Sequence, residues 1–354
     1  MTPDLTKIKK ILIVQYLPFG DVLLGTAYTE ILKKLFNPEI HYLAAKPFDQ
    51  ILEGHPYIDK VVSFEIGKGM DYAINRIKIL KEINKEKYDL VIDQLGKPSC
   101  KQMILFSGAK YKLGWTNSRM NYLLNLKAER TYHGYSSTRH LEILRPLGIM
   151  PQRYRLYIHV PENASKKVKN WMLEKGLKKE NLIGIAPSSK DRKKKWNIDL
   201  FKELTLNLIE TYKKKIILIY APSEYEDALE VYNGVNHPDV FMSPSLNIKE
   251  SAALLQNIEL LISNDAAIHH MSVATATPSI AIFGPTDAQT WCAEGDFPLH
   301  YRVKNDQWVP ESNKDDFGIS VTDVMKKVEQ AYLEIKNTKW SEDLFYCDPK
   351  KQTY

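Results

Sequence analysis

The chain has 354 residues, of which 44% are hydrophobic and 26% charged; this excludes a disordered chain, a collagen-like fibre and a disulfide-stapled miniprotein. Its length predicts about two domains. The three scattered cysteines argue against a zinc site and favour a reducing compartment. No apolar run reaches the roughly 18–20 residues that cross a bilayer. The net charge of +6 is uneven, because residues 1–160 carry 24 Lys and Arg against 15 Asp and Glu, which indicates either an anionic partner for that half or a lysine-rich surface kept for solubility.

The first half of the chain alternates apolar runs with amphipathic segments. Runs typical of buried strands occupy residues 11–14, 40–43, 61–62 and 88–92. Helical spacing predicts helices over residues 22–35, near 48–52 and over about 72–84, where Ile74, Ile77, Leu80 and Ile83 would share one face. Strands that alternate with helices predict a parallel sheet with helices on both faces.

The second half repeats this pattern after a charged segment that prolines and a glycine interrupt, residues 151–180. Strands are predicted at residues 182–186, 216–220, 260–263 and 279–283, and helices at about 164–173, 200–209, 248–256, 266–276 and 321–335. We predict a first domain over residues 1–160, a second over 161–320, and a C-terminal helix and tail over 321–354 that packs back towards the first domain. Ligands of such α/β domains bind at the carboxyl ends of the strands, so two facing domains would form one cleft.

The turn after the first strand contains Gly20 and Asp21. Gly20 permits a close approach of a ligand to the backbone. Asp21 stands at a predicted helix N-terminus, where it is either a helix cap or a general base facing the ligand. The turn lacks the Gly-x-Gly-x-x-Gly pattern, which argues against the alternative of a nicotinamide-dependent oxidoreductase.

The loop after residues 182–186 begins with Ser188 and Ser189 and continues with five cations and one acid up to Lys195. Hydroxyls and lysines can bind the oxygens of a diphosphate. The alternative is a solvated basic loop, but its position at the carboxyl end of a strand favours anion binding.

A third candidate is the end of the strand at residues 260–263. Asp265 precedes a helix of small residues that starts with Ala266 and Ala267, and backbone N–H groups at such a start can bind an anion. His270 lies one turn into this helix, where it has either a structural or a functional role.

The strand at residues 279–283 ends in the turn Gly284-Pro-Thr-Asp287. Thr286 and Asp287 either bind a ligand at the same sheet edge or only form the turn.

Taken in order, these motifs resemble glycosyltransferase family 9, the ADP-heptose:lipopolysaccharide heptosyltransferases. The resemblance covers nearly the whole chain and rests on Gly20-Asp21, the segment His55–Val61, the hydroxyl pair Ser188-Ser189, Lys194 with Trp196, Asp265 with His270, and Gly284–Asp287. It implies a GT-B fold, with two Rossmann-like doubly wound domains and the active site in the cleft between them. It also implies inversion at the anomeric carbon without a metal or other cofactor.

The resemblance also implies roles for individual residues. Asp21 would be the catalytic base, assisted at the leaving diphosphate by Lys194 and His270. The residues implied to bind the donor are Gly20, Ser188, Ser189, Lys194, Glu224, Leu246, Asp265, Ala266, Ala267, His270, Thr286 and Asp287. Arg119, with Trp115 and Lys112 in the basic and aromatic stretch 110–140, would bind the anionic acceptor.

Two observations bear on the metal and the donor. No Asp-x-Asp pair occurs, with which metal-dependent glycosyltransferases hold a divalent ion. Ala266 and Ala267 replace the family's hydroxyl and glycine, which removes one possible phosphate donor and leaves open a divergent transferase with another nucleotide sugar.

We therefore expect transfer of heptose from ADP-heptose to a lipopolysaccharide inner-core or related envelope glycan. The alternatives are the divergent transferase and a non-catalytic GT-B glycan-binding protein. The expected location is the cytoplasm, with contact to the inner face of the inner membrane, and no nucleic acid partner is expected.

Overall fold

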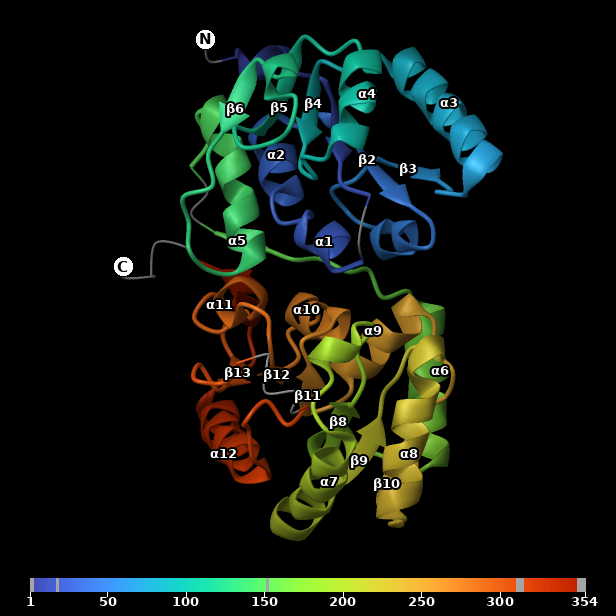
Figure 1. Ribbon diagram of the computed structural model, residues 1–354, viewed down its shortest axis with the longest axis vertical. Helices are drawn as coiled ribbons and strands as arrows, with labels where there is room; N and C mark the ends of the chain where they lie inside the picture. Colours follow the sequence, from blue (N-terminus) through green and yellow to red (C-terminus); the bar gives the residue numbers. More distant parts are fainter. Residues whose placement is uncertain (1–2, 17–18, 151–152, 310–314, 349–354) are drawn as a thin grey trace. The chain divides into compact units, whose positions relative to one another are not determined.

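A computed structural model describes residues 3–16, 19–150, 153–309 and 315–348 (Figure 1). The chain divides into two compact units, Met1–His159 with Asp348–Tyr354, and Val160–Cys347. Each unit contains a six-stranded parallel sheet flanked by helices, which confirms the predicted α/β class. None of the helices in the described residues is long and apolar enough to cross a membrane.

The sheet of the first unit has the strand order β3-β2-β1-β4-β5-β6. Its strands are β1 (Lys10–Val14), β2 (Glu39–Ala45), β3 (Lys60–Phe64), β4 (Leu90–Asp93), β5 (Tyr111–Trp115) and β6 (Leu126–Ala128). Its helices are α1 (Phe19–Leu24), α2 (Thr29–Phe36), α3 (Gly69–Glu86), α4 (Pro98–Phe106) and α5 (Ser136–Leu141). Strands β5 and β6 have no counterpart in the predicted pattern.

The sheet of the second unit has the equivalent order β10-β9-β8-β11-β12-β13. Its strands are β8 (Leu182–Ala186), β9 (Lys215–Leu218), β10 (Val240–Met242), β11 (Leu260–Asn264), β12 (Ser279–Phe283) and β13 (His300–Lys304). Its helices are α6 (Glu162–Glu174), α7 (Ile198–Tyr212), α8 (Tyr225–Val235), α9 (Ile248–Gln256), α10 (Ala267–Ala274), α11 (Ala288–Trp291) and α12 (Val321–Asn337). The short strands β7 (Tyr154–Arg155) and β14 (Tyr346–Cys347) lie outside both sheets.

Helix α12 packs within the second unit. Its side chains at Val324, Val328 and Ala331 are fully buried in the hydrophobic core with α7 and the sheet. Ser320 and Asp323 form a capping box that starts the helix. The apolar stripe of α12 therefore belongs to the core of the second unit, and the expected packing of the C-terminal helix and tail back towards the first domain stays a prediction.

Helix α3 differs from its prediction in the face that it buries. Ile79 and Ile83 pack in the core, as does Arg76, whose Nε donates to Oε1 of Gln102 on α4 at 3.1 Å. Ile74 and Ile77, which were expected on the buried face, are 44% and 54% exposed. The helix carries two apolar stripes, and only one can face the sheet.

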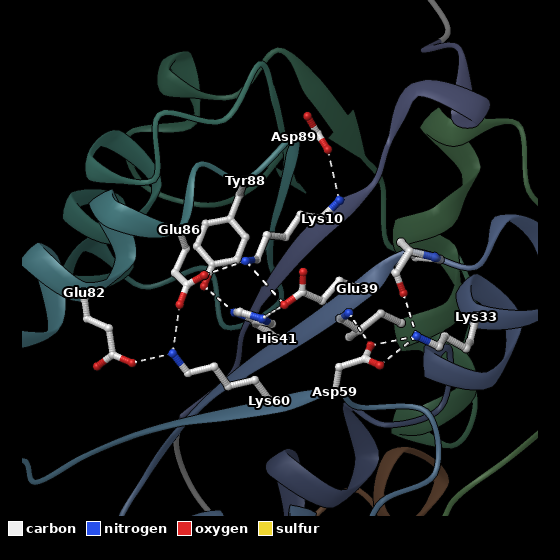
Figure 2. Close-up of polar contacts among 12 residues, drawn as sticks. Lys10, Lys33, Glu39, His41, Asp59, Lys60, Glu82, Glu86, Tyr88 and Asp89 are labelled. Atoms are coloured by element: carbon white, nitrogen blue, oxygen red, sulfur yellow. Dashed lines mark hydrogen bonds and ion pairs between the residues drawn. The ribbon is translucent and has the colours of Figure 1, made fainter.

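The amino edge of the first sheet is fastened by ion pairs (Figure 2). Lys10 lies 2.5 Å from a carboxylate oxygen of Glu86 and 3.4 Å from Glu39, and Lys60 lies 2.9 Å from Glu86. His41 bridges Glu39, at 2.7 Å, and the Tyr88 hydroxyl, at 2.9 Å. Hydrogen bonds from Lys10 and Lys60 lower the pKa of Glu86 to about 2. These charges join strands β1, β2 and β3 to the end of α3.

Candidate active site

Asp21 lies in the first turn of α1, the short helix that follows β1. The hydroxyl of Tyr42 on the neighbouring strand β2 donates to the carbonyl of Val22 at 3.0 Å and fastens this helix to the sheet. Gly25 allows this approach, because a Cβ at that position would lie 2.3 Å from the Tyr42 hydroxyl. Asp21 and Gly20 are both partly exposed at the carboxyl edge of the sheet.

Arg130, one of the cations of the basic and aromatic stretch 110–140, follows β6. Its guanidinium carbon lies 4.3 Å from the centroid of the Trp115 ring, a stacked cation–π contact. The Trp115 indole N–H in turn donates to the backbone carbonyl of Gln94 at 2.9 Å. Burial and the charge of Arg139 lower the pKa of Arg130, whereas the charge of Asp21 raises it. Arg130 is thus a positioned cation within electrostatic reach of Asp21.

A buried ion pair supports the same edge. Nζ of Lys101 on α4 lies 2.5 Å from Oδ2 of Asp93 at the end of β4, and both side chains are at most 1% exposed. Lys101 also donates to Oγ of Ser118 at 3.2 Å, and Asp93 accepts from the N–H of Gly96 at 2.9 Å. The pair therefore fixes the loops after β4 and β5, the second of which contains Arg119.

The three residues expected to bind the acceptor lie in different environments. Arg119 is exposed in the loop after β5. Trp115 is 1% exposed and its ring lies against the Arg130 guanidinium. Its contact with the acceptor stays a prediction. Lys112 is the second residue of β5 and lies about 10 Å along the strand from Trp115, towards the opposite edge. The structure therefore does not bring Lys112 to this site.

In the second unit, the loop after β8 is held from both sides. The Asn264 side chain accepts from the N–H of Trp196 at 2.9 Å and donates to the carbonyl of Pro187 at 2.8 Å. The buried Ser188 hydroxyl donates to a carboxylate oxygen of Asp227, which also lies 2.5 Å from Nζ of Lys195. Ser188 is therefore engaged by a side chain of α8.

Asp265 joins three of the predicted motifs. Its Oδ2 atom lies 2.7 Å from Nζ of Lys194 and accepts from the Thr286 hydroxyl at 2.6 Å. Its backbone carbonyl accepts from the hydroxyl of the buried Ser189 at 3.4 Å. The structure thus brings together residues from the carboxyl ends of β8, β11 and β12.

Helix α10 begins directly after Asp265, with Ala266 as its N-cap. Ala266 makes no side-chain hydrogen bond to the helix, and both Ala266 and Ala267 are partly exposed. Burial, opposed by the charge of Asp265 and aided by that of Lys194, lowers the pKa of His270 to about 4. His270 is therefore neutral near pH 7, and its ring centroid lies 6.1 Å from that of Trp291.

Three of the implied donor-binding residues lie on surrounding turns. The Glu224 carboxylate accepts from the N–H of Ala221 at 3.1 Å. Leu246 is partly exposed between β10 and α9. The Asp287 carboxylate caps α11 by accepting from the N–H of Gln289 at 3.0 Å. Its binding of the donor stays a prediction.

A pocket of about 1030 Å³ borders the same loop. Residues lining it include Lys190, Arg192, Lys193, Lys195, Asp227 and Trp308. Lys195 lines this pocket, whereas Lys194 does not and pairs with Asp265 instead. The two neighbouring lysines therefore lie in different environments. Within the described residues, no group of three or more His, Cys, Asp or Glu side chains is placed to hold a metal ion.

Residues 76–318, more than half of the chain, match the sequence profile of glycosyltransferase family 9 (heptosyltransferase). The chain belongs to glycosyltransferase family 9. It is therefore a glycosyltransferase, and the two parallel six-stranded sheets are those of the GT-B fold.

Relatives of known name agree with the family 9 assignment. A lipopolysaccharide heptosyltransferase 1 of Campylobacter coli is 26% identical over 300 residues, which cover 78% of this chain and 84% of the relative. The crystal structure of a family 9 glycosyltransferase from Veillonella parvula superimposes with a TM-score of 0.77 at 21% identity, over 92% of this chain and 97% of that one. The structure of the E. coli ADP-heptose lipopolysaccharide heptosyltransferase II gives a TM-score of 0.71 at 18% identity, over 92% and 99%.

Some residues of the candidate site had only weak sequence signals. Arg130 lies in the basic and aromatic stretch, but its stacking on Trp115 depends on two short strands at the sheet edge. Asp93 stands at the end of an apolar run, just as Asp265 follows one. This position at a predicted strand end was the one sequence signal for Asp93. Asp227 contacts Ser188 and Lys195 from a helix that had not been predicted.

Proposed function

We propose that this enzyme transfers heptose from ADP-heptose to an anionic lipopolysaccharide-core or related envelope glycan. The observation that carries the proposal is the convergence of Lys194, Asp265 and Thr286 beside the start of α10. The names of the relatives, among them an ADP-heptose lipopolysaccharide heptosyltransferase, supply the sugar and the acceptor class.

The donor diphosphate would bind where the cation and the helix start meet. Lys194 would move from Asp265 to a phosphate oxygen, and the backbone N–H groups at Ala266 and Ala267 would bind the same group. The neutral His270 would donate a hydrogen bond rather than a full charge. Glu224 and Leu246 would contact the ribose and the base. Because protein groups supply the positive charge, we propose that no metal is required.

The chemical step would be a direct displacement with inversion. The acceptor oxygen would bond to the anomeric carbon as the bond from that carbon to the phosphate oxygen breaks, and ADP would leave. Asp21 would take the proton of the acceptor hydroxyl, and Lys194 would stabilise the charge that develops on the diphosphate.

Arg130 would bind a carboxylate or phosphate of the acceptor. Its guanidinium is held against the buried Trp115 ring, and among the described residues no hydrogen bond or ion pair occupies it. A guanidinium presents paired donors that suit a carboxylate or phosphate. Arg119, exposed on the nearby loop, would bind a second anionic group. The three cysteines are free and buried, which suits a reducing compartment such as the cytoplasm.

A donor screen tests the proposal. ADP-, UDP- and GDP-sugars are incubated with a lipid A–Kdo acceptor, with and without EDTA, and products are read by mass spectrometry. We expect one added heptose from ADP-heptose alone, unchanged by EDTA. Turnover with a different nucleotide sugar would support a divergent donor, which the missing hydroxyl at Ala266 favours, and glycan binding without any turnover would support a non-catalytic role.

The base is tested with Asp21→Asn. We expect transfer to fall by about 10²–10⁴-fold, while ADP binding, measured by calorimetry, stays as in the wild type. Full activity of this variant would refute the assignment of Asp21.

A further inference from the structure

The solvent face of helix α3 combines exposed apolar side chains with lysines. Met70, Ile74 and Ile77 follow one another at helical spacing, and Met70 is 76% exposed. Isolated exposed apolar residues are common, but three in one stripe form a patch that calls for a partner.

The second half of this face is basic. Lys78, Lys81 and Lys85 are exposed and lie at i+4 spacing from Ile74, Ile77 and Lys81. Within the described part of the chain, no ion pair includes any of these three lysines. Two acidic residues of the helix pair with Lys60 instead (Figure 2). A carboxylate oxygen of Glu82 and one of Glu86 each lie 2.9 Å from Nζ of Lys60. The third, Asp71, lies in the first turn.

The apolar end of α3 lies at the functional edge of its unit. Helix α3 follows the carboxyl end of β3, and α1 with Asp21 follows the carboxyl end of β1 in the same parallel sheet. Met70 in the first turn of α3 therefore lies at the same edge as Asp21. Figure 1 shows α3 at the outside of this unit, beside α4.

We propose that this face, Met70, Ile74, Ile77, Lys78, Lys81 and Lys85, docks the enzyme on an anionic lipid bilayer. Apolar side chains enter the headgroup region, and lysine ammonium groups meet lipid phosphates. A second copy of the chain fits less well, because a two-fold contact sets lysines against lysines or against apolar side chains. The benefit to catalysis rests on the proposed function, in which the acceptor is a glycolipid.

Vesicle sedimentation of the full chain tests the docking face. Vesicles of phosphatidylcholine alone are compared with vesicles that also contain phosphatidylglycerol, at low and high salt. We expect binding to the anionic vesicles that salt weakens. Met70→Ser/Ile74→Ser/Ile77→Ser and Lys78→Gln/Lys81→Gln/Lys85→Gln should each lower the partition coefficient by about tenfold or more.

A matched control variant uses α6 of the second unit. Leu173→Ser/Lys166→Gln/Lys169→Gln changes residues that are also exposed, Leu173 being 80% exposed, and this variant should bind vesicles as the wild type does. All replaced side chains are exposed, so circular dichroism and thermal melting should be unchanged. Turnover of a water-soluble, deacylated acceptor should also be unchanged in the α3 variants.

Three results would overturn the docking face. The first is that the wild type fails to bind anionic vesicles. The second is that the α6 control loses as much binding as the α3 variants. The third is that the wild type is a dimer that the apolar variant dissociates, while vesicle binding is absent. Vesicle binding needs neither donor nor turnover, so failure of heptose transfer would leave this test intact.

Discussion

Nζ of Lys194 lies 2.7 Å from Oδ2 of Asp265, so a residue after β8 and a residue after β11 form one ion pair at the carboxyl edge of the second sheet. Lys194 is 26% exposed, whereas Asp265 is 5% exposed. Lys194 therefore reaches the solvent, whereas the Asp265 carboxylate with which it pairs is buried. This geometry suits a cation that is held ready and then shared with a phosphate group.

Replacement of this lysine should impair departure of the diphosphate. Lys194→Met should reduce kcat by about 10²–10³-fold, because one charge that stabilises the leaving group is lost. Steady-state kinetics with ADP-heptose measure the effect. Lys193→Met, one residue earlier and exposed, is the control and should stay within about twofold of the wild type. Equal losses in both variants would contradict a specific role for Lys194.

Arg130 should affect the acceptor rather than the donor. Arg130→Gln should raise KM for the anionic acceptor by about tenfold or more, since a charge-assisted hydrogen bond contributes about 1.5–3 kcal/mol. The Kd for ADP, from calorimetry, should not change. Arg130→Lys keeps the charge and should recover part of the loss. An altered Kd for ADP with an unaltered acceptor KM would contradict this assignment.

The buried pair Asp93–Lys101 should matter for stability. Lys101→Met leaves Asp93 buried without its cation, and the free energy of unfolding should fall by about 3–5 kcal/mol. Asp93→Asn/Lys101→Met removes both charges and should be less destabilised than the single variant. Urea denaturation measures both. A loss below about 1 kcal/mol, as in an exposed pair, would contradict the dry environment of this pair.

Glu86 should make the first unit sensitive to acid. Its pKa is lowered to about 2 in the folded chain from an ordinary value of 4.5. The carboxylate therefore stabilises the fold above about pH 4.5, and this contribution is lost as the pH falls through about 2. Glu86→Gln should lower Tm at pH 6 and flatten the decline of Tm between pH 5 and pH 3.

Calorimetric scans across this range measure the effect of Glu86. Glu82→Gln is the control on the same helix, because Lys60, at 2.9 Å, is the one ion-pair partner of Glu82 among the residues that the structure describes. A wild-type decline that Glu86→Gln leaves unchanged would contradict the role of Glu86.

The sequence was sufficient to predict those strands that are buried on both faces. Residues 11–14 and 182–186 are apolar runs with almost no exposed surface, so their strands and the parallel class could be predicted. The meeting of Lys194, Asp265 and Thr286 also followed, because parallel strands bring their carboxyl ends to one edge.

Tertiary packing decided what the sequence could not. The two apolar stripes of α3 are equivalent in the sequence, and contact with the sheet selects Ile79 and Ile83 over Ile74 and Ile77. Strand β5 contains Lys112 and Gly114 between its apolar residues, so the sequence shows no continuous apolar run there. The position of Arg130 over a buried indole depends on this strand and its neighbour, and no periodicity indicates it.

Under the proposed function, the order of the loop after β8 would also affect the entropy of nucleotide binding. Asn264 holds both its ends, and Lys195 is tied to Asp227 while Lys194 is tied to Asp265. Such a loop is already ordered, so a nucleotide that binds to it avoids most of the conformational entropy loss that a flexible phosphate-binding loop incurs. Asn264→Ala would remove the hydrogen bonds that hold this loop. The affinity for ADP would then fall because the binding entropy becomes more unfavourable, although Asn264 itself would not contact the ligand.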